Sequence, residues 1–340
     1  MTQIKWHHIS EGEDHCSWNV PHSEFNERWP QYILELDNVI VGYNGVIFND
    51  NFEYIKEANF SYGFWNFLSN DQVRPNNLKE YLDSSYEFFP VNSERKKVDE
   101  ELPLANYVFA LHFFNWYPFG HHFDVMLALK KIEELQLSSP KLLVNAANWG
   151  AIKELDNHFK LFGYQPQQLN KLDIKEDKYF FIPKLFYPSP ASYPANPSKM
   201  GLAYARSKYM SLIEKPQVCD KQFYLSRENC AARKVVNEEE VQDFLKKKGF
   251  IVISETKSIV EDVKNFSQAR RLIGPHGSRW HNLFLSTNLE ECWEFCPDNR
   301  KDFNFFGMGK NMGLQYNWIP TAADKDHNIT ISLDYLRSIL

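Results

Sequence analysis

The sequence predicts an α/β protein built from two domains. Its 340 residues are enough for two domains with sizeable cores. Between residues 223 and 297, short apolar runs alternate with capped amphipathic segments, a pattern typical of a doubly wound parallel sheet. Residues 107–182 show a weaker copy of this alternation. We therefore expect two Rossmann-like domains, residues 1–198 and 199–340, facing each other across a cleft.

The composition narrows the class of protein. Hydrophobic residues make up 43% of the chain and charged residues 24%, as in ordinary globular proteins. The net charge of −6 argues against a general nucleic-acid-binding protein. We expect no membrane span and no secretory signal, because the chain has no long apolar run and starts with polar residues. The five cysteines have no disulfide spacing, so Cys292 and Cys296 are expected to be buried thiols in a cytoplasmic protein.

The N-terminal domain is predicted to open with a β-hairpin. Asn44-Gly45 separates two β-branched runs within residues 37–55, which is a strong hairpin signal. Gly163 is expected to end a helix. Five prolines lie between residues 183 and 197, where we expect a long loop or linker, because a helix or central strand would not accept them. The other predicted elements are strands over 107–111, 141–144 and 179–182 and a helix over 151–162.

The C-terminal domain has the clearest signals for helix ends. Asn237 and Glu240 form a capping-box pattern at the start of one helix, and Gly249 ends it. Ser258 and Glu261 repeat the capping pattern before the next helix. The other predicted elements are helices over 198–213 and 280–286, a buried strand over 250–253, a strand over 271–273 and a final strand over 292–295.

One loop after a predicted strand carries two arginines. Arg227 and Arg233 precede the helix that begins near Asn237. Arginine makes bidentate contacts with phosphate, and a helix N-terminus adds oriented amides. The alternative is that both arginines are exposed and pair with surface groups.

A second loop, from Gly274 to Ser278, ends a strand and opens a helix. Glycine permits close backbone approach, so the amides of Gly277 and Ser278 could meet a phosphate to which His276 donates. The loop matches neither the Walker motif nor the GxGxxG fingerprint. A tight turn with a capping histidine explains the same residues.

The N-terminal domain contains a candidate general base in the segment GHHFD. Helical spacing places His121 and Asp124 on one side of a helix and turns His122 away. A histidine with a carboxylate at a helix start could remove a proton from an acceptor. A buried or capping histidine is the alternative.

Short segments of the C-terminal domain follow one another in a recognisable order. They are SRENCAARKVVNEEEV, KKGF, SQARRLIGPHGSRWHNLFL and ECWEF, all between residues 222 and 297. Their order resembles that of glycosyltransferase family 61, and NGVIF and GHHFD are similar to its N-terminal part more weakly. The resemblance implies a fold of the GT-B type, an inverting mechanism, UDP-sugar donors and no required metal or other cofactor.

The resemblance also implies roles for individual residues. Arg227 and Arg233 would contact the diphosphate of the donor. His276, Gly277 and Asn282 would line the donor pocket.

Glu294 would reach the ribose of the donor. The chain departs from the family pattern at residues 278–280, Ser-Arg-Trp, where small or apolar residues are usual. It also departs at GHHFD, which is more compact than the family's histidine-and-acid segment. The base therefore stays open among His121, His122 and Asp124.

Two other patterns contain metal-ligand residue types. Asp324 and Asp326 form a D-x-D pair, which in metal-dependent sugar transferases follows an apolar strand. Here the surroundings are polar, so we interpret the pair as a loop and expect no metal. The spacing of the N-terminal cluster matches no zinc pattern, which favours surface histidines and a structural thiol. That cluster comprises His7, His8, His15, Cys16 and His22.

The sequence thus predicts a transferase that moves a sugar from a UDP-sugar to a glycan acceptor. Residues 199–340 would bind the nucleotide sugar and residues 1–198 would form the acceptor side. Expected roles are capsule or lipopolysaccharide synthesis, with hexosyl or pentosyl transfer. The alternative is a non-catalytic nucleotide- or glycan-binding protein on the same fold.

Overall fold

The computed structural model divides into two compact units. Unit 1 contains residues Met1–Ser17 and Asn26–Tyr204, and unit 2 contains Trp18–Phe25 and Ala205–Leu340. No helix among the described residues is long and apolar enough to cross a membrane. The described residues are 2–8, 18–20, 23–25, 32–42, 45–59, 97–110, 129–145, 155–174, 178–189, 192–193, 196–197, 199–214, 218–255, 257–300 and 303–340.

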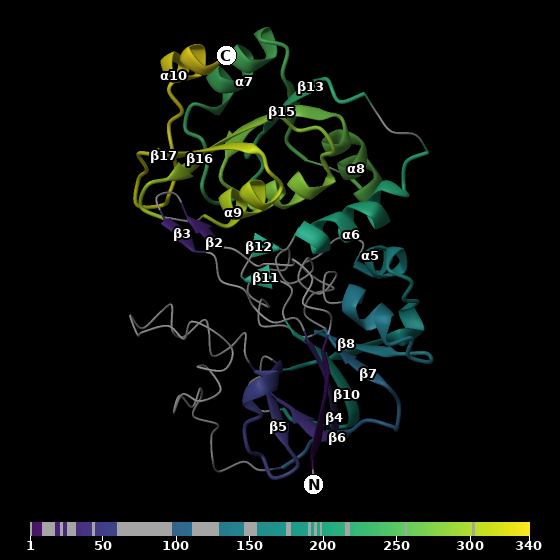
Figure 1. The fold of residues 1–340 in the computed structure, drawn as a ribbon. Helices are drawn as coiled ribbons and strands as arrows, with labels where there is room; N and C mark the ends of the chain where they lie inside the picture. Colours follow the sequence, from purple (N-terminus) through teal and green to yellow (C-terminus); the bar gives the residue numbers. More distant parts are fainter. Residues whose placement is uncertain are drawn as a thin grey trace. The chain divides into compact units, whose positions relative to one another are not determined.

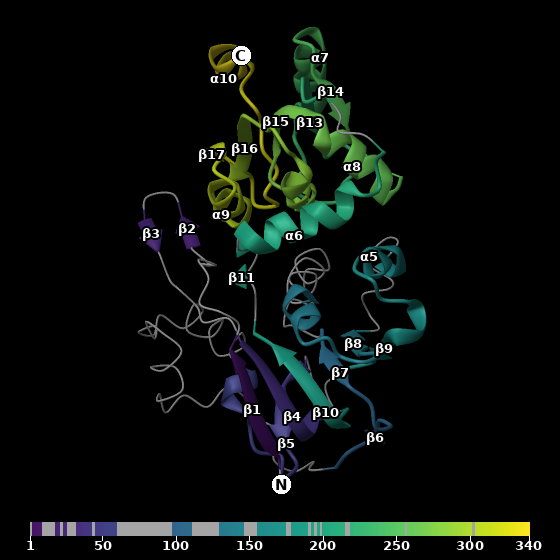
Figure 2. The same ribbon diagram turned by 45° about the vertical axis from the view of Figure 1, so that its right-hand side comes forward.

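Unit 1 is built on a mixed sheet with the order β1-β4-β10-β7-β8-β9 among the described strands (Figures 1 and 2). β10, β7, β8 and β9 are parallel, whereas β4 runs antiparallel to both β1 and β10. The strands are β1 (Gln3–His8), β4 (Tyr32–Val41), β5 (Ile47–Asn49), β6 (Glu100–Glu101), β7 (Tyr107–Phe109), β8 (Lys141–Asn145), β9 (Leu169–Leu172), β10 (Phe180–Pro188), β11 (Ser192–Tyr193) and β12 (Asn196–Pro197).

Two predicted features of unit 1 are confirmed, and the described helices of this unit are short. The hairpin predicted over residues 37–55 is confirmed, since β5 pairs antiparallel with the end of β4. Gly163 has φ +88° and follows α5, which confirms it as a helix stop. The helical segments are η2 (Lys56–Ala58), residues 129–134, α5 (Leu155–Leu161), η4 (Pro166–Gln168) and α6 (Lys199–Met210), which continues into unit 2.

The proline-rich segment does not begin as the loop or linker that we expected. Pro183 and Pro188 lie in β10, a central strand. Pro183 is absent from the pairing register, and the facing Asn38 has φ 55°. On the other side of β10, β6 pairs only with residues 180–181 and β7 only with residues 185–186. Proline is accepted there because both ladders are interrupted and no N–H donor is needed.

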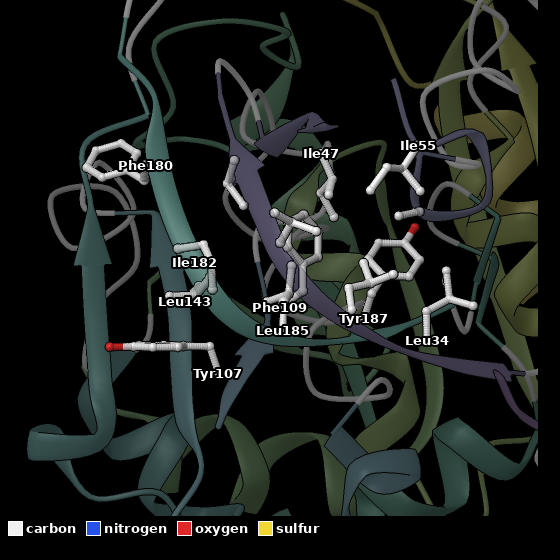
Figure 3. Close-up of a cluster of buried hydrophobic side chains, with 14 of the residues drawn as sticks. Leu34, Ile47, Ile55, Tyr107, Phe109, Leu143, Phe180, Ile182, Leu185 and Tyr187 are labelled. Atoms are coloured by element: carbon white, nitrogen blue, oxygen red, sulfur yellow. The ribbon is translucent and has the colours of Figure 1, made fainter. Parts of the chain in front are cut away.

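Val108 and Leu142 are buried on one face of this sheet, and a larger cluster of buried side chains packs on the other face. Figure 3 shows its side chains, which come mainly from β4, β7, β8 and β10. Tyr107 and Leu185 are fully buried there. Other buried members are Leu34, Ile47, Ile55, Phe109, Leu143, Phe180, Ile182 and Tyr187.

The opposite face of the same sheet carries an ionic network centred on Glu35. Its carboxylate lies 2.5 Å from Nζ of Lys184, 2.9 Å from Nε2 of His7 and 3.1 Å from Nζ of Lys5. The hydrogen bond from Lys184 is the main cause that lowers the pKa of Glu35 to about 2. The network therefore joins β1, β4 and β10 across the sheet.

Unit 2 contains a five-stranded parallel sheet among its described residues, with the order β14-β13-β15-β16-β17 (Figure 1). α7 and α10 cover one face, and α8, η5 and α9 cover the other. The elements are β13 (Lys221–Leu225), α7 (Glu238–Lys247), β14 (Ile251–Ile253), α8 (Ile259–Ser267), β15 (Ala269–Pro275), η5 (Ser278–Leu285), β16 (Glu291–Pro297), α9 (Asn304–Asn311), β17 (Gln315–Thr321) and α10 (Leu333–Ile339). A separate pair, β2 (Trp18–Val20) and β3 (Ser23–Phe25), belongs to this unit, and β2 lies against α9.

Several predicted details of unit 2 are confirmed. Ser258 Oγ accepts a hydrogen bond from the backbone N–H of Glu261 at 3.3 Å, and Gly249 has φ +85° at the end of α7. Cys292 and Cys296 are buried thiols. These features depend on local sequence or on strand alternation, which explains why the sequence predicts them.

Three other details are corrected. Asn237 is at the N-cap position of α7, but its side chain bonds the backbone of Ile331 instead of capping. Ile251 is 45% exposed, because β14 is an edge strand and not a buried one. Residues 292–295 are not in the last strand, since β17 follows. β17 is another edge strand, so it lacks the apolar run that marks the central strands.

We expect Glu35→Gln to lower the free energy of unfolding by about 1–2 kcal/mol at neutral pH, because Lys184, Lys5 and His7 lose their shared carboxylate partner. The loss stays modest because water partly screens these groups. The folded pKa of Glu35 is depressed below its ordinary 4.5, so this stabilisation is complete above that pH and is lost as the pH falls toward 2. Urea unfolding from pH 7 to 2.5 measures the difference between variant and wild type. A difference that does not shrink in acid contradicts the assignment. Asp156→Asn, which removes an exposed pair with Lys171, is the control.

Candidate active site

The site lies at the edge of the unit 2 sheet where the strands end. The strand order corresponds to 2-1-3-4-5 along the chain, so the winding reverses between β13 and β15. Ligands of open α/β sheets bind outside the carboxyl ends of the strands at such a reversal. Arg227 follows β13 there, and His276 and Gly277 follow β15.

Two residues predicted from separate motifs are in direct contact at this point. A Cβ atom on Gly277 would lie 2.1 Å from Nη1 of Arg227, so the guanidinium rests against the glycine backbone. Gly277 has φ 176°, which any residue adopts, so glycine is required here for space and not for backbone conformation. The arginine loop therefore meets the turn after β15, which is shorter than predicted because Gly274 and Pro275 lie in the strand.

Arg227 also organises its own loop. Its Nε donates to the carbonyl of Arg233 at 3.0 Å, and its Nη2 donates to the carbonyl of Ala232 at 2.8 Å. Arg233, at the far end of the loop, has φ 55°. Burial lowers the pKa of Arg227, and the nearby charges of Arg233, Arg279 and Arg300 lower it further. The loop is thus wound around a half-buried cation.

The end of the loop is held by the segment around Asn328. The backbone N–H of Lys234 donates to Oδ1 of Asn328 at 2.8 Å, and the N–H of Ile329 donates to the carbonyl of Lys234 at 2.9 Å. Asp324 Oδ1 accepts from the N–H groups of Asp326 and Asn328 at 2.8 and 2.9 Å. The D-x-D pair is therefore the predicted loop, and its first carboxylate closes a turn. No group of three or more possible metal ligands occurs among the described residues.

Arg279 is a residue whose role the sequence did not reveal. Its guanidinium donates to the carbonyls of Ser226, Ile253 and Ser254, at 3.2, 2.6 and 2.6 Å. These carbonyls follow or end β13 and β14, so Arg279 ties two strand ends to the start of η5. Burial lowers its pKa. The only sequence signal was the departure from the family pattern at residues 278–280.

His276 belongs to a buried polar network. Its Nδ1 lies 2.7 Å from Oε1 of Glu294, and the hydroxyl of Tyr316 donates to Oε2 of Glu294 at 2.9 Å. His276 is 3% exposed and Glu294 is 0% exposed. Burial raises the pKa of the Tyr316 hydroxyl, so it remains a donor. The ring of His276 also packs on Phe305, with centroids 5.2 Å apart. Glu294 therefore fixes the loop after β15.

A second network supports the end of β13. The hydroxyls of Tyr224 and Ser226 both donate to the carboxylate of Glu238 at the start of α7. Gln242, one turn later, donates to Glu228 at 2.8 Å. The sequence shows only an acidic first turn, which is common at helix N-termini, so this role was missed.

The structure places some of the other predicted site residues, and the rest lie outside its described part. Ser278 and Asn282 are half-buried in η5, and the Ser278 carbonyl lies 3.1 Å from Nδ1 of His281. The candidate bases His121, His122 and Asp124 lie outside the described residues, as do His15, Cys16 and His22 of the N-terminal cluster. His7 and His8 lie in β1, and His7 pairs with Glu35.

In unit 2, an α/β unit, the arginine loop thus meets the glycine-containing turn at the reversal point of a parallel sheet. The family model described as Glycosyltransferase 61 matches residues 70–292. That is more than half of the chain, so the protein belongs to glycosyltransferase family 61 and is a glycosyltransferase. No curated protein matches the sequence significantly. Family membership implies a sugar donor and a glycan acceptor, and it favours an enzyme over a non-catalytic binding protein.

We expect Gly277→Ala to reduce sugar transfer by about 10- to 100-fold or more, because the added methyl group must displace the Arg227 guanidinium from its two carbonyl partners. Initial rates with donor and acceptor measure the effect. Gly163→Ala is the control for lost stability. It adds a methyl group in open space but strains a positive-φ helix stop in unit 1, so it leaves the contact of Arg227 with Gly277 intact. Equal rates for Gly277→Ala and wild type would contradict the contact.

We expect Glu294→Ala to destabilise unit 2 by about 3–5 kcal/mol, because His276 and Tyr316 lose their buried partner. Chemical denaturation measures this loss. Glu290→Ala is the control: it breaks an exposed pair with Arg270 and should cost only about 0–1 kcal/mol. Similar losses of unfolding free energy in both variants would show that the buried network stabilises unit 2 no more than an exposed ion pair does.

Proposed function

We propose that the protein is an inverting glycosyltransferase that transfers a hexose or pentose from a UDP-sugar to a glycan acceptor. Family membership supports sugar transfer. The observation that carries the donor assignment is the contact of Arg227 with Gly277 at the reversal point of the sheet. There Arg227 and the arginines near it present positive charge beside the amides of the turn after β15, which suits a nucleoside diphosphate.

In this proposal each residue at the sheet edge has its own role. Arg233 contacts the donor diphosphate, and Arg227 holds the loop that presents it while sharing the positive field. The amides of Gly277 and Ser278 offer further donors, and Asn282 lines the pocket. Glu294 acts as a positioning residue and not through direct ribose contact, because its two carboxylate oxygens bind His276 and Tyr316 inside the protein.

The chemistry has two requirements. A base must take the proton of the acceptor hydroxyl as the sugar bond forms with inversion, and His121, His122 and Asp124 remain the candidates. The departing diphosphate must be stabilised, and here arginines and loop amides supply that stabilisation without a metal ion. We further propose a GT-B type fold of two Rossmann-like domains, in which unit 1 provides the acceptor side and unit 2 the donor side.

The cellular role is part of the same proposal. We propose that the enzyme works in the cytoplasm, in capsule or lipopolysaccharide synthesis. The negative net charge and the hydrophobic content of an ordinary globular protein agree with this setting. A capsule or lipopolysaccharide intermediate would then be the glycan acceptor.

We expect Arg233→Ala to lower kcat for sugar transfer by about 10²–10³-fold, because removal of one electrostatic donor to a developing anion typically costs about 2.7–4 kcal/mol. Transfer from a panel of UDP-sugars to mixed glycan acceptors measures this. UDP at about a hundred times its dissociation constant should also stabilise the wild type by about 2.7 kcal/mol in a thermal-shift assay.

Lys234→Ala, which removes the next cation of the same loop, is the control for a general charge effect. The assay repeated in EDTA tests the metal-free mechanism, and activity that depends on added Mg²⁺ or Mn²⁺ would refute that part. A wild type that shows neither transfer nor donor hydrolysis, with UDP still bound, would instead indicate a non-catalytic binding protein.

A further inference from the structure

Ser226, the residue directly before Arg227, is bonded through its N–H, its carbonyl and its hydroxyl. Its backbone N–H donates to the carbonyl of Ile253 at 2.9 Å, and its carbonyl accepts from Nη1 of Arg279 at 3.2 Å. Its hydroxyl donates to Oε1 of Glu238, at the start of α7. Ser226 is only 2% exposed. It therefore belongs to the interior of unit 2 and is not itself a ligand contact.

The hydroxyl of Ser226 also holds the backbone on the far side of Arg227. Its oxygen accepts from the backbone N–H of Glu228 at 3.1 Å and from Nε2 of Gln242 at 3.3 Å. Nε2 of Gln242 donates to the Glu228 carboxylate at 2.8 Å as well. The carbonyl of Arg227 accepts from the N–H of Cys230 at 2.9 Å. The residues on both sides of Arg227 are thus fixed through one hydroxyl group.

Glu238 sets the direction of this hydroxyl. Serine has one O–H donor and two acceptor lone pairs. Because the donor points at Oε1 of Glu238, both lone pairs are left for the N–H of Glu228 and the amide of Gln242. The other carboxylate oxygen, Oε2, accepts from the hydroxyl of Tyr224 at 2.8 Å, and Tyr224 is fully buried in β13. Glu238 is therefore anchored to the strand that leads into the arginine loop.

The charge of Glu238 has the wrong sign for a direct contact with an anion. Its carboxylate is bonded to the residue next to Arg227, so by its field alone it would oppose the binding of a diphosphate. Glu239 and Glu240 follow it in α7, carry the same charge and are exposed to solvent. A comparison among these three glutamates can therefore separate the effect of charge from the effect of the bonds to β13.

We propose that Glu238 is a positioning residue for donor binding. It holds the hydroxyl of Ser226 and thereby the backbone of Arg227, whose guanidinium rests against Gly277. Glu238 acts through Ser226 and does not touch the ligand. This inference rests on the proposed function, because it assumes that this edge of the sheet binds a nucleoside diphosphate.

The test measures the affinity of the full-length protein for UDP and for inorganic pyrophosphate by titration calorimetry. We expect Glu238→Ala to weaken both by about 10- to 100-fold, because the hydrogen bonds to a charged group that hold the arginine loop are lost. The lost negative charge acts in the opposite direction, since its field alone would make anion binding tighter. Glu238→Gln also loses the charge but keeps an acceptor oxygen for Ser226, so it should recover part of the affinity.

A double-mutant cycle tests the route through Ser226. We expect Ser226→Ala to weaken the binding of both probes by a factor similar to that of Glu238→Ala. The variant with both substitutions should lose much less than the product of the two factors, because each single change already removes the same hydrogen bond. Factors that multiply fully would show that Glu238 does not act through Ser226, and would refute the proposal.

Glu239→Ala and Glu240→Ala are the matched controls. Each removes the same charge from the same turn of α7, and each should bind the probes as tightly as the wild type or slightly more tightly. Thermal unfolding midpoints without ligand show whether every variant is folded at the temperature of the titration. If Glu238→Ala is not folded, Glu238→Gln takes its place, because it keeps the size of the side chain.

The outcomes separate the positioning role from the proposed function. If the wild type binds UDP or pyrophosphate and the folded Glu238 variant binds them within twofold of the wild type, or more tightly, the role of Glu238 is refuted and the donor site stands. If the wild type binds neither probe, the proposed donor site itself fails, and the role of Glu238 fails with it. A loss of affinity in Glu239→Ala equal to that in Glu238→Ala would also refute the role.

Discussion

The site of unit 2 depends on one contact, the Arg227 guanidinium resting against the backbone of Gly277. It joins the loop after β13 to the loop after β15, at the place where the winding of the sheet reverses. A parallel sheet brings its carboxyl ends to one edge, so a contact between two such loops creates a single surface from segments about fifty residues apart. The bonds from Arg227 to its own loop then hold the cation in place.

Buried hydrogen bonds hold the loops that form this surface. Glu294 binds His276 and Tyr316 beneath the β15 loop, and Arg279 binds the carbonyls at the ends of β13 and β14. Such groups are costly to bury unless they are bonded, so each restricts the loop above it to one arrangement. The protein itself therefore holds the like charges of Arg227, Arg233 and Arg279 near one another. That preorganisation is what a transferase without a metal ion would need to stabilise a departing diphosphate.

Prediction succeeded where the cause is local and failed where it is not. The caps at Ser258 and Gly249 follow from side-chain oxygen and backbone rules that act within one turn. Asn237 has the same local signal, yet its amide bonds Ile331, almost a hundred residues away. Pro183 likewise enters a central strand, because two neighbouring ladders are interrupted beside it. A single sequence does not show which distant residues will be bonded to one another.

By itself, the sequence determined the α/β class, the positions of the arginine loop and of the glycine-containing loop after β15, and the resemblance to glycosyltransferase family 61, which the family model confirms. These properties are encoded in periodicity, glycine placement and the order of short motifs. Only the tertiary structure decided that Arg227 reaches Gly277, that Glu294 is buried against His276, and that Arg279 binds carbonyls at strand ends. The physical reason is that strand order sets which loops become neighbours, and strand order depends on long-range packing that residue spacing does not record.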